Sequence, residues 1–178
     1  MLYFLSGGSA SGKSALAERI CCALSGPHIY IATMPVRDSE DERKVARHHA
    51  LRAGRGFAGT LEMPGRLGDV PPEAAVLFEC LSTFTANRMF TCGEAEPPEG
   101  WEERLWAELK AHLLDRPGHT VVVSAEVACD GTQYDEYTEA YRAVLTGLGR
   151  RLAAEADCAV EAVCGRAVVH KGKLPDTP

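Results

Sequence analysis

Short apolar runs alternate along this chain with longer stretches in which apolar residues recur every three or four positions. The short runs end at polar or turn residues and predict strands; they cover residues 2–5, 28–32, 75–78, 120–124, 159–163 and 168–170. The longer stretches predict helices and cover residues 15–24, 38–53, 101–114 and 134–156. This alternation predicts an α/β fold with a mainly parallel sheet flanked by helices.

The pattern also indicates where the core lies. Leu105, Leu109 and Leu113 form an apolar stripe along the predicted helix 101–114, which is more typical of core packing than of cofactor contact. The run 120–124 is almost continuously apolar, as expected for a strand in the middle of a parallel sheet.

Composition narrows the class of protein. A chain of 178 residues is long enough for one domain with a real core, and we expect a single domain over residues 1–178. The formal net charge of −6 argues against a nucleic-acid-binding surface, and no apolar run is long enough to span a membrane. The seven cysteines contain no C-x-x-C pair, so we expect reduced thiols, no zinc site and a cytoplasmic protein without a secretory signal.

The first predicted strand leads into a phosphate-binding loop of the P-loop NTPase type. Its pattern, G-x-x-x-x-G-K-[ST], is complete in Gly7, Gly8, Ser9, Ala10, Ser11, Gly12, Lys13 and Ser14. The glycines let backbone N–H groups turn toward a phosphate, and the following helix contributes its positive N-terminal end. Lys13 is expected to contact the terminal phosphates and Ser14 to ligate Mg²⁺. The sequence therefore predicts binding of a nucleoside triphosphate.

Two further candidates lie at the carboxyl ends of predicted strands, where α/β sheets bind ligands. Thr33 follows the strand 28–32 and is either close to the nucleotide or an ordinary loop residue. Glu79 follows the strand 75–78, and we favour a role at the Mg²⁺ water shell or as a base toward a hydroxyl over a charged strand end with no function.

The predicted helix 38–53 carries His48, His49 and Arg52 close together on one side. On an isolated helix both histidines would be ordinary solvated residues. A neutral imidazole, however, can attack an α-phosphorus and hold the nucleotidyl group as a phosphoramidate. Arg52 lies one helical turn from His48, where its charge would offset that of the phosphates.

Together these segments resemble the bifunctional adenosylcobinamide kinase/adenosylcobinamide-phosphate guanylyltransferases of cobalamin assembly. That family opens with a strand and G-G-x-x-S-G-K-S, matched by Gly7 to Ser14, and continues with Y-I-A-T, matched by Tyr30 to Thr33. Its R-I-x-x-H-x-x-x-R is matched by Lys44 to Arg52, with lysine in the first place. Its T-x-E is matched by Thr60 to Glu62, and Glu79 takes the place of its acidic residue before C-[LI]-T.

The resemblance implies a function in two steps. A triphosphate, ATP or GTP, phosphorylates the aminopropanol hydroxyl of adenosylcobinamide, and GTP then passes GMP through a histidine to the new phosphate. By register that histidine is His48, while Arg52 and Glu62 would orient the guanine nucleotide. The resemblance also implies nucleotide contacts from Ala32, Met34 and His49. It implies Mg²⁺ as the metal and a homo-oligomeric assembly, which is a trimer in this family. Asn87 falls where the family has an asparagine and receives no role.

The second half departs from the family at two places. After the strand 120–124 the family has N-E-V-G-x-G-[IV]-V-P, and here only Glu126 and Val127 match well, with Ala125 at the asparagine. Near the end of the long helix its N-Q is replaced by Gly149-Arg150. These departures leave open a catalytically reduced, nucleotide-binding regulatory protein. A P-loop kinase of another small alcohol, with His48 incidental, also stays open.

Overall fold

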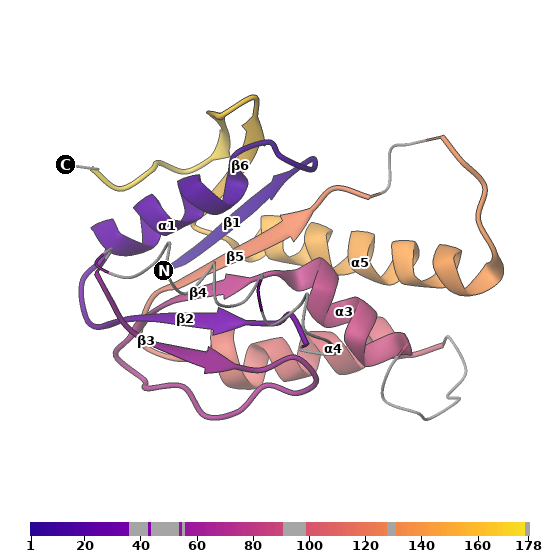
Figure 1. Ribbon diagram of the computed structural model, residues 1–178, viewed down its shortest axis with the longest axis horizontal. Coiled ribbons are helices and arrows are strands. Elements are labelled where there is room, and N and C mark those ends of the chain that lie inside the picture. Colours follow the sequence, from indigo (N-terminus) through magenta and orange to yellow (C-terminus); the bar gives the residue numbers. More distant parts are fainter. Residues whose placement is uncertain (36–42, 44–53, 55, 91–98, 128–130, 177–178) are drawn as a thin grey trace.

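A seven-stranded sheet with strand order β3-β2-β4-β5-β1-β6-β7 forms the centre of the computed structural model (Figure 1). The structure describes residues 1–35, 43, 54, 56–90, 99–127 and 131–176. The strands are β1 Leu2–Gly7, β2 His28–Ala32, β3 Phe57–Glu62, β4 Ala75–Glu79, β5 Thr120–Ala125, β6 Cys158–Val163 and β7 Arg166–Lys171. The helices are α1 Lys13–Ala23, α3 Leu81–Phe90, α4 Trp101–Leu109, η1 Lys110–Leu114 and α5 Glu136–Glu155.

All neighbouring strands are parallel except β6 and β7, which form an antiparallel hairpin. The predicted α/β fold with a mainly parallel sheet is therefore confirmed. The strand β3 was not predicted, because its side chains are exposed or only half-buried and it contains Gly59. An edge strand of this kind lacks the clear apolar pattern on which a sequence-based prediction depends.

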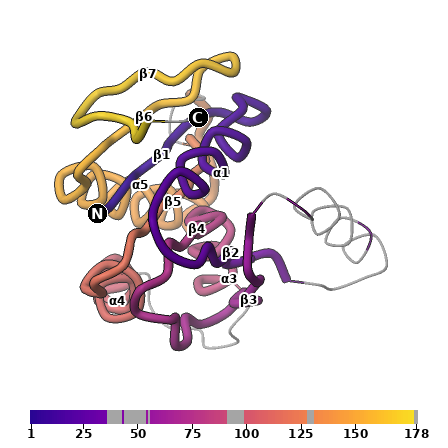
Figure 2. The backbone as a smooth tube through the Cα atoms, turned by 90° about the vertical axis from the view of Figure 1, so that its left-hand side faces the viewer, coloured from indigo at the N-terminus to yellow at the C-terminus, as the bar shows by residue number. Residues whose placement is uncertain are grey.

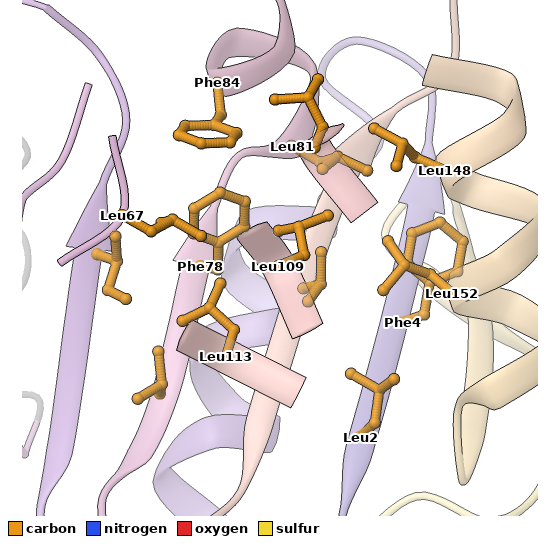
Figure 3. Packing of buried hydrophobic residues seen from close by; sticks show 14 of the residues in the cluster. Leu2, Phe4, Leu67, Phe78, Leu81, Phe84, Leu109, Leu113, Leu148 and Leu152 are labelled. Carbon is orange, nitrogen blue, oxygen red and sulfur yellow. The ribbon is translucent and has the colours of Figure 1, made fainter. Parts of the chain in front are cut away.

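Alternating side chains of each strand pack against different helices. Leu2 and Phe4 of β1 belong to a core cluster with α3, α4 and α5, whereas Tyr3 and Leu5 belong to a second cluster with α1. Figure 2 shows the strands in their spatial order, from β7 to β3, with α1 on one side of the sheet and α4 and α5 on the other. Figure 3 shows the first cluster, in which Phe4 points from β1 toward Leu152 of α5.

The predicted helices in the described residues are present with small shifts of their ends. The stretch 101–114 is an α-helix as far as Leu109 and continues as one π-helical turn, η1. Its stripe of Leu105, Leu109 and Leu113 is fully buried, which confirms the predicted core role. The predicted helix 38–53 lies outside the described residues, apart from residue 43. The cysteines that the structure describes are free thiols.

Candidate active site

The phosphate-binding loop connects β1 to α1 at the carboxyl edge of the sheet, between the ends of β5 and β6. A Cβ atom on Gly7 would lie 2.7 Å from the carbonyl oxygen of Ala162 and 2.7 Å from Ser11 Oγ. Gly12 caps α1 with φ of 90°, a left-handed conformation that costs other residues free energy. The first and last glycines of the motif are therefore required by packing and backbone geometry.

The middle of the loop is open to solvent. Gly8, Ser9 and Ala10 are exposed, and a Cβ atom on Gly8 would meet nothing within 4 Å. Lys13 Nζ donates a hydrogen bond to the carbonyl oxygen of Gly8 at 2.9 Å, so the ammonium group lies over the loop. This cradle, with a cation above it and a helix N-terminus beside it, fits a phosphate group.

The hairpin of β6 and β7 supports the loop from the neighbouring edge of the sheet. The backbone N–H of Gly165, at the hairpin turn, donates to the carbonyl oxygen of Ser11 at 2.8 Å. A Cβ atom on Gly12 would lie 3.1 Å from the Cα of Gly165. The loop conformation therefore depends on a contact with the last two strands.

Glu79, at the end of β4, is held by two hydroxyl groups. Ser14 Oγ donates a short hydrogen bond to Glu79 Oε1, and Tyr30 Oη donates to Glu79 Oε2 at 3.1 Å. Tyr30 is buried, and its ring packs edge-on against Phe57 with 5.9 Å between centroids. The two predicted metal-binding residues, Ser14 and Glu79, thus lie together although β5 separates their strands.

Thr33 holds the backbone at Glu79 and Cys80, next to the same carboxylate. Its side chain is buried, accepts a hydrogen bond from the N–H of Cys80 at 2.7 Å, and lies 3.0 Å from the carbonyl oxygen of Glu79. The backbone N–H of Thr33 also donates to the Glu79 carbonyl at 3.1 Å. Thr33 is therefore more than an ordinary loop residue, and a direct contact with a nucleotide stays a prediction.

Asn87, which had no assigned role, connects the loops at this edge. It is buried in α3, and its Nδ2 donates to the carbonyl oxygens of Thr33 at 2.8 Å and Pro64 at 2.9 Å. Removing a buried amide that donates to two carbonyl oxygens lowers the free energy of unfolding. Asn87 therefore positions the loops that follow β2 and β3.

The remaining predicted nucleotide-binding residues of the described chain lie at the carboxyl ends of β2 and β3. Ala32 pairs in register with Glu62 of β3 on one side and with Glu79 of β4 on the other. Two strand spacings separate Glu62 from Glu79, which places their Cα atoms about 10 Å apart. Glu62 is exposed, and Met34 follows in the loop after β2. The geometry brings Ala32, Met34 and Glu62 to the edge that carries the phosphate-binding loop.

The chemistry of Ser14 and Glu79 fits a magnesium ion that a nucleotide brings with it. Mg²⁺ usually takes one or two protein oxygens and completes its shell with phosphate and water. Among the residues that the structure describes, no group of three or more His, Cys, Asp or Glu side chains is placed to hold a metal by itself. One hydroxyl and one carboxylate beside the loop fit a metal that is shared with phosphate.

His48, His49 and Arg52 lie outside the described residues, so their predicted roles stay predictions. Tyr30 is the functional candidate that the sequence analysis did not single out. It matched the Y-I-A-T motif, but nothing in the sequence shows that β2 lies beside β4 with Ala32 opposite Glu79.

Comparison with known proteins identifies the family. A family model described as cobinamide kinase / cobinamide phosphate guanyltransferase matches residues 3–169. The chain belongs to this family. The bifunctional adenosylcobalamin biosynthesis protein CobU of Salmonella typhimurium is 29% identical, with 88% of this chain and 92% of that protein covered. The protein of the same name from Escherichia coli is 28% identical with the same coverage.

A third relative has a similar identity to this chain. The bifunctional adenosylcobalamin biosynthesis protein CobP of Pseudomonas aeruginosa is 31% identical over 76% of this chain and 77% of its own length. Among solved structures, a type III secretion system ATPase of pathogenic bacteria matches with a TM-score of 0.51 and 14% identity. That match covers 94% of this chain and 56% of the ATPase, and it shows the P-loop fold alone. Within the described residues, no helix combines the length and apolar composition needed to cross a membrane.

Proposed function

We propose that the protein phosphorylates adenosylcobinamide and then transfers GMP from GTP, through a histidine, to form adenosylcobinamide-GDP. The observation that carries the proposal is the arrangement of Lys13, Ser14 and Glu79 around one phosphate-binding loop. Family membership over residues 3–169 supports the choice of substrates. ATP or GTP serves the first step, and GTP with Mg²⁺ serves the second.

In the kinase step the aminopropanol hydroxyl oxygen attacks the γ-phosphorus, the bond to the bridging oxygen of the nucleoside diphosphate breaks, and the hydroxyl proton passes to solvent water. Lys13 and the N–H groups of the loop stabilise the charge on the phosphate oxygens. A bound Mg²⁺ would supply further charge neutralisation. Glu79 already receives hydrogen bonds from Ser14 and Tyr30 on its two oxygens, which favours a metal-binding role for it over that of general base.

In the guanylyl transfer step an imidazole nitrogen of His48 attacks the α-phosphorus of GTP, and pyrophosphate leaves. A phosphate oxygen of adenosylcobinamide phosphate then attacks the same phosphorus, and the neutral imidazole leaves. Arg52 offsets the phosphate charge, and Glu62 orients the guanine nucleotide together with Ala32, Met34 and His49. The two half-reactions share GMP as the transferred group, so the atoms balance without a further reactant.

Intact-protein mass spectrometry tests the histidine intermediate. After incubation with GTP and Mg²⁺, we expect a GMP-sized gain in the wild type and in the matched control His49→Ala, and none in His48→Ala. A gain that persists in His48→Ala overturns the assignment of His48. No gain in the wild type, with GTP still bound, overturns guanylyl transfer altogether.

Phosphorylation of adenosylcobinamide tests the kinase step. Lys13→Ala removes the cation above the loop, and we expect phosphoryl transfer to fall at least about a hundredfold while the fold is retained. Wild-type protein that binds GTP tightly but phosphorylates no corrinoid would identify a regulatory protein. We further propose a single-domain, cytoplasmic homotrimer, and light scattering after gel filtration measures the assembly.

A further inference from the structure

A cavity of about 340 Å³ lies between the sheet and α5, on the face opposite α1. Phe4 and Ser6 of β1 and Ser124 and Ala125 of β5 line one side, and Gly149 of α5 lines the other. Figure 3 shows Phe4 pointing from β1 into the layer between the sheet and α5. This volume is at the low end of the range for ligand sites. The cavity is therefore large enough for one side chain of a corrinoid but too small for its ring.

The cavity adjoins the phosphate-binding loop. Ser6 immediately precedes Gly7, and the backbone N–H of Glu126 donates to the carbonyl oxygen of Gly7 at 3.0 Å. Ser6 and Ser124 are register partners in β1 and β5, so their side chains lie on the same face of adjacent strands. An occupant of the cavity is therefore close enough to belong to a molecule that reacts at the loop.

The lining favours a neutral polar occupant. Phe4 and Leu145 supply apolar surface, and Ser6, Ser124 and Thr146 supply hydroxyl groups that both donate and accept hydrogen bonds. Among the described residues of the lining, the charged side chains are Glu126 and Arg150, which have opposite signs, so no excess of positive charge favours a phosphate there. A primary amide on an aliphatic arm matches this combination, because it donates, accepts and carries no charge.

The two departures of this chain from its family meet in this cavity. Ala125 stands where the family pattern has asparagine, and Gly149 and Arg150 stand where it has N-Q. The chain thus lacks three side-chain amides at one place. A Cβ atom on Gly149 would lie 3.7 Å from Phe4 Cζ, an ordinary contact, so glycine is not required there by packing.

We propose that this cavity binds one of the peripheral amide arms of the corrinoid substrate and so orients its aminopropanol hydroxyl toward the phosphate-binding loop. The proposal rests on the proposed function, because it takes cobinamide as the substrate. Arg150 is exposed at the cavity and makes no ion pair within the described part of the chain, which leaves its guanidinium available to the amide carbonyl.

Filling the cavity tests the proposal. The variant Gly149→Leu places a branched apolar side chain in the cavity beside Phe4, and leucine is a better helix residue than glycine. Ala143→Leu, on an exposed position of α5 outside the cavity, is the matched control. Calorimetry measures the Kd for cobinamide and, separately, for GTP with Mg²⁺. Thermal unfolding checks the fold of each variant.

We expect the filled variant to bind cobinamide at least about tenfold more weakly, with the Kd for GTP changed less than about twofold and the control like the wild type. Unchanged cobinamide binding in a folded filled variant overturns the cavity assignment while the proposed function stands. Wild-type protein that binds no cobinamide overturns both. Equal losses for cobinamide and GTP show a general disturbance of the loop and also overturn the assignment. If the cavity assignment holds, Arg150→Gln weakens cobinamide binding and leaves the Kd for GTP unchanged. Unchanged cobinamide binding in this variant contradicts the role of Arg150.

Discussion

Tyr30 Oη donates a hydrogen bond to Glu79 Oε2 at 3.1 Å, from a ring buried beneath the carboxyl edge of the sheet. Ser14 binds the other carboxylate oxygen, so the orientation of Glu79 is set from two directions. A carboxylate held in this way presents its remaining lone pairs in a fixed direction, which is what a metal shell shared with phosphate requires.

Removing the Tyr30 hydroxyl should impair magnesium use more than nucleotide binding. Tyr30→Phe keeps the edge-on contact with Phe57 but loses the hydrogen bond, so we expect the Mg²⁺ concentration for half-maximal kinase activity to rise about five- to tenfold. Tyr3→Phe is the matched control, because Tyr3 is buried in the same core cluster and its hydroxyl donates to Met1 Sδ at 3.8 Å, away from Glu79. An unchanged magnesium dependence in Tyr30→Phe would show that this hydroxyl does not position Glu79.

Two glycines of the phosphate-binding loop should respond differently to alanine. Gly12→Ala places a Cβ at φ of 90° and 3.1 Å from Gly165, and we expect a loss of about 1–2 kcal/mol in stability together with nucleotide binding. Gly8→Ala meets no neighbour within 4 Å, so its stability should stay within about 0.5 kcal/mol of the wild type while nucleotide affinity falls. Urea unfolding and GTP titration separate the two effects. Equal stability loss in both variants would contradict the packing argument.

Asn87 should matter for stability as well as for the site. Asn87→Ala leaves the carbonyl oxygens of Thr33 and Pro64 without this donor, and we expect a loss of about 1–3 kcal/mol in the free energy of unfolding. Thr33 in turn contacts the backbone of Glu79, so kinase activity should fall even where the variant is fully folded. Chemical unfolding followed by an activity assay well below the transition tests both parts; full activity in the folded variant would limit Asn87 to a structural role.

The thiol of Cys21 should make the protein less stable in alkali. Burial raises the pKa of Cys21 from 9.0 to about 12, so the unfolded chain loses a proton in this range before the folded one does. The stabilising contribution is complete below pH 9 and is lost as the pH rises toward 12, at about 1.4 kcal/mol per pH unit. Urea unfolding at pH 8.5 and 10.5 should therefore show a steeper loss for the wild type than for Cys21→Ala. Parallel losses in the two proteins would show that this thiol does not titrate on unfolding.

Much of the fold and part of the site could be predicted from local patterns. The strands with buried, apolar side chains were found. The phosphate-binding motif pointed to Ser14, and the rule that ligands bind at carboxyl ends of strands pointed to Thr33 and Glu79. The edge strand β3 was missed because its surroundings, and not its own residues, make it a strand.

Features that depend on the order of strands could not be predicted. Tyr30 reaches Glu79 only because β2 pairs with β4, and the sequence contains no direct record of that pairing. Ala125 and Gly149 were noticed separately as departures from a family pattern, and only the position of α5 on the sheet shows that they line one cavity. Contacts between residues far apart in sequence can be found only from the tertiary structure, because no single residue indicates its partner.

The hydrogen bond from Gly165 to Ser11 has a consequence for biosynthesis of the protein. The turn that supports the loop is synthesised much later than the loop, after β5 and α5. Contacts so distant in sequence form late, because a long stretch of chain must be ordered first. A nascent chain that has not yet produced the β6-β7 hairpin therefore carries the nucleotide-binding motif without the contact that supports its conformation.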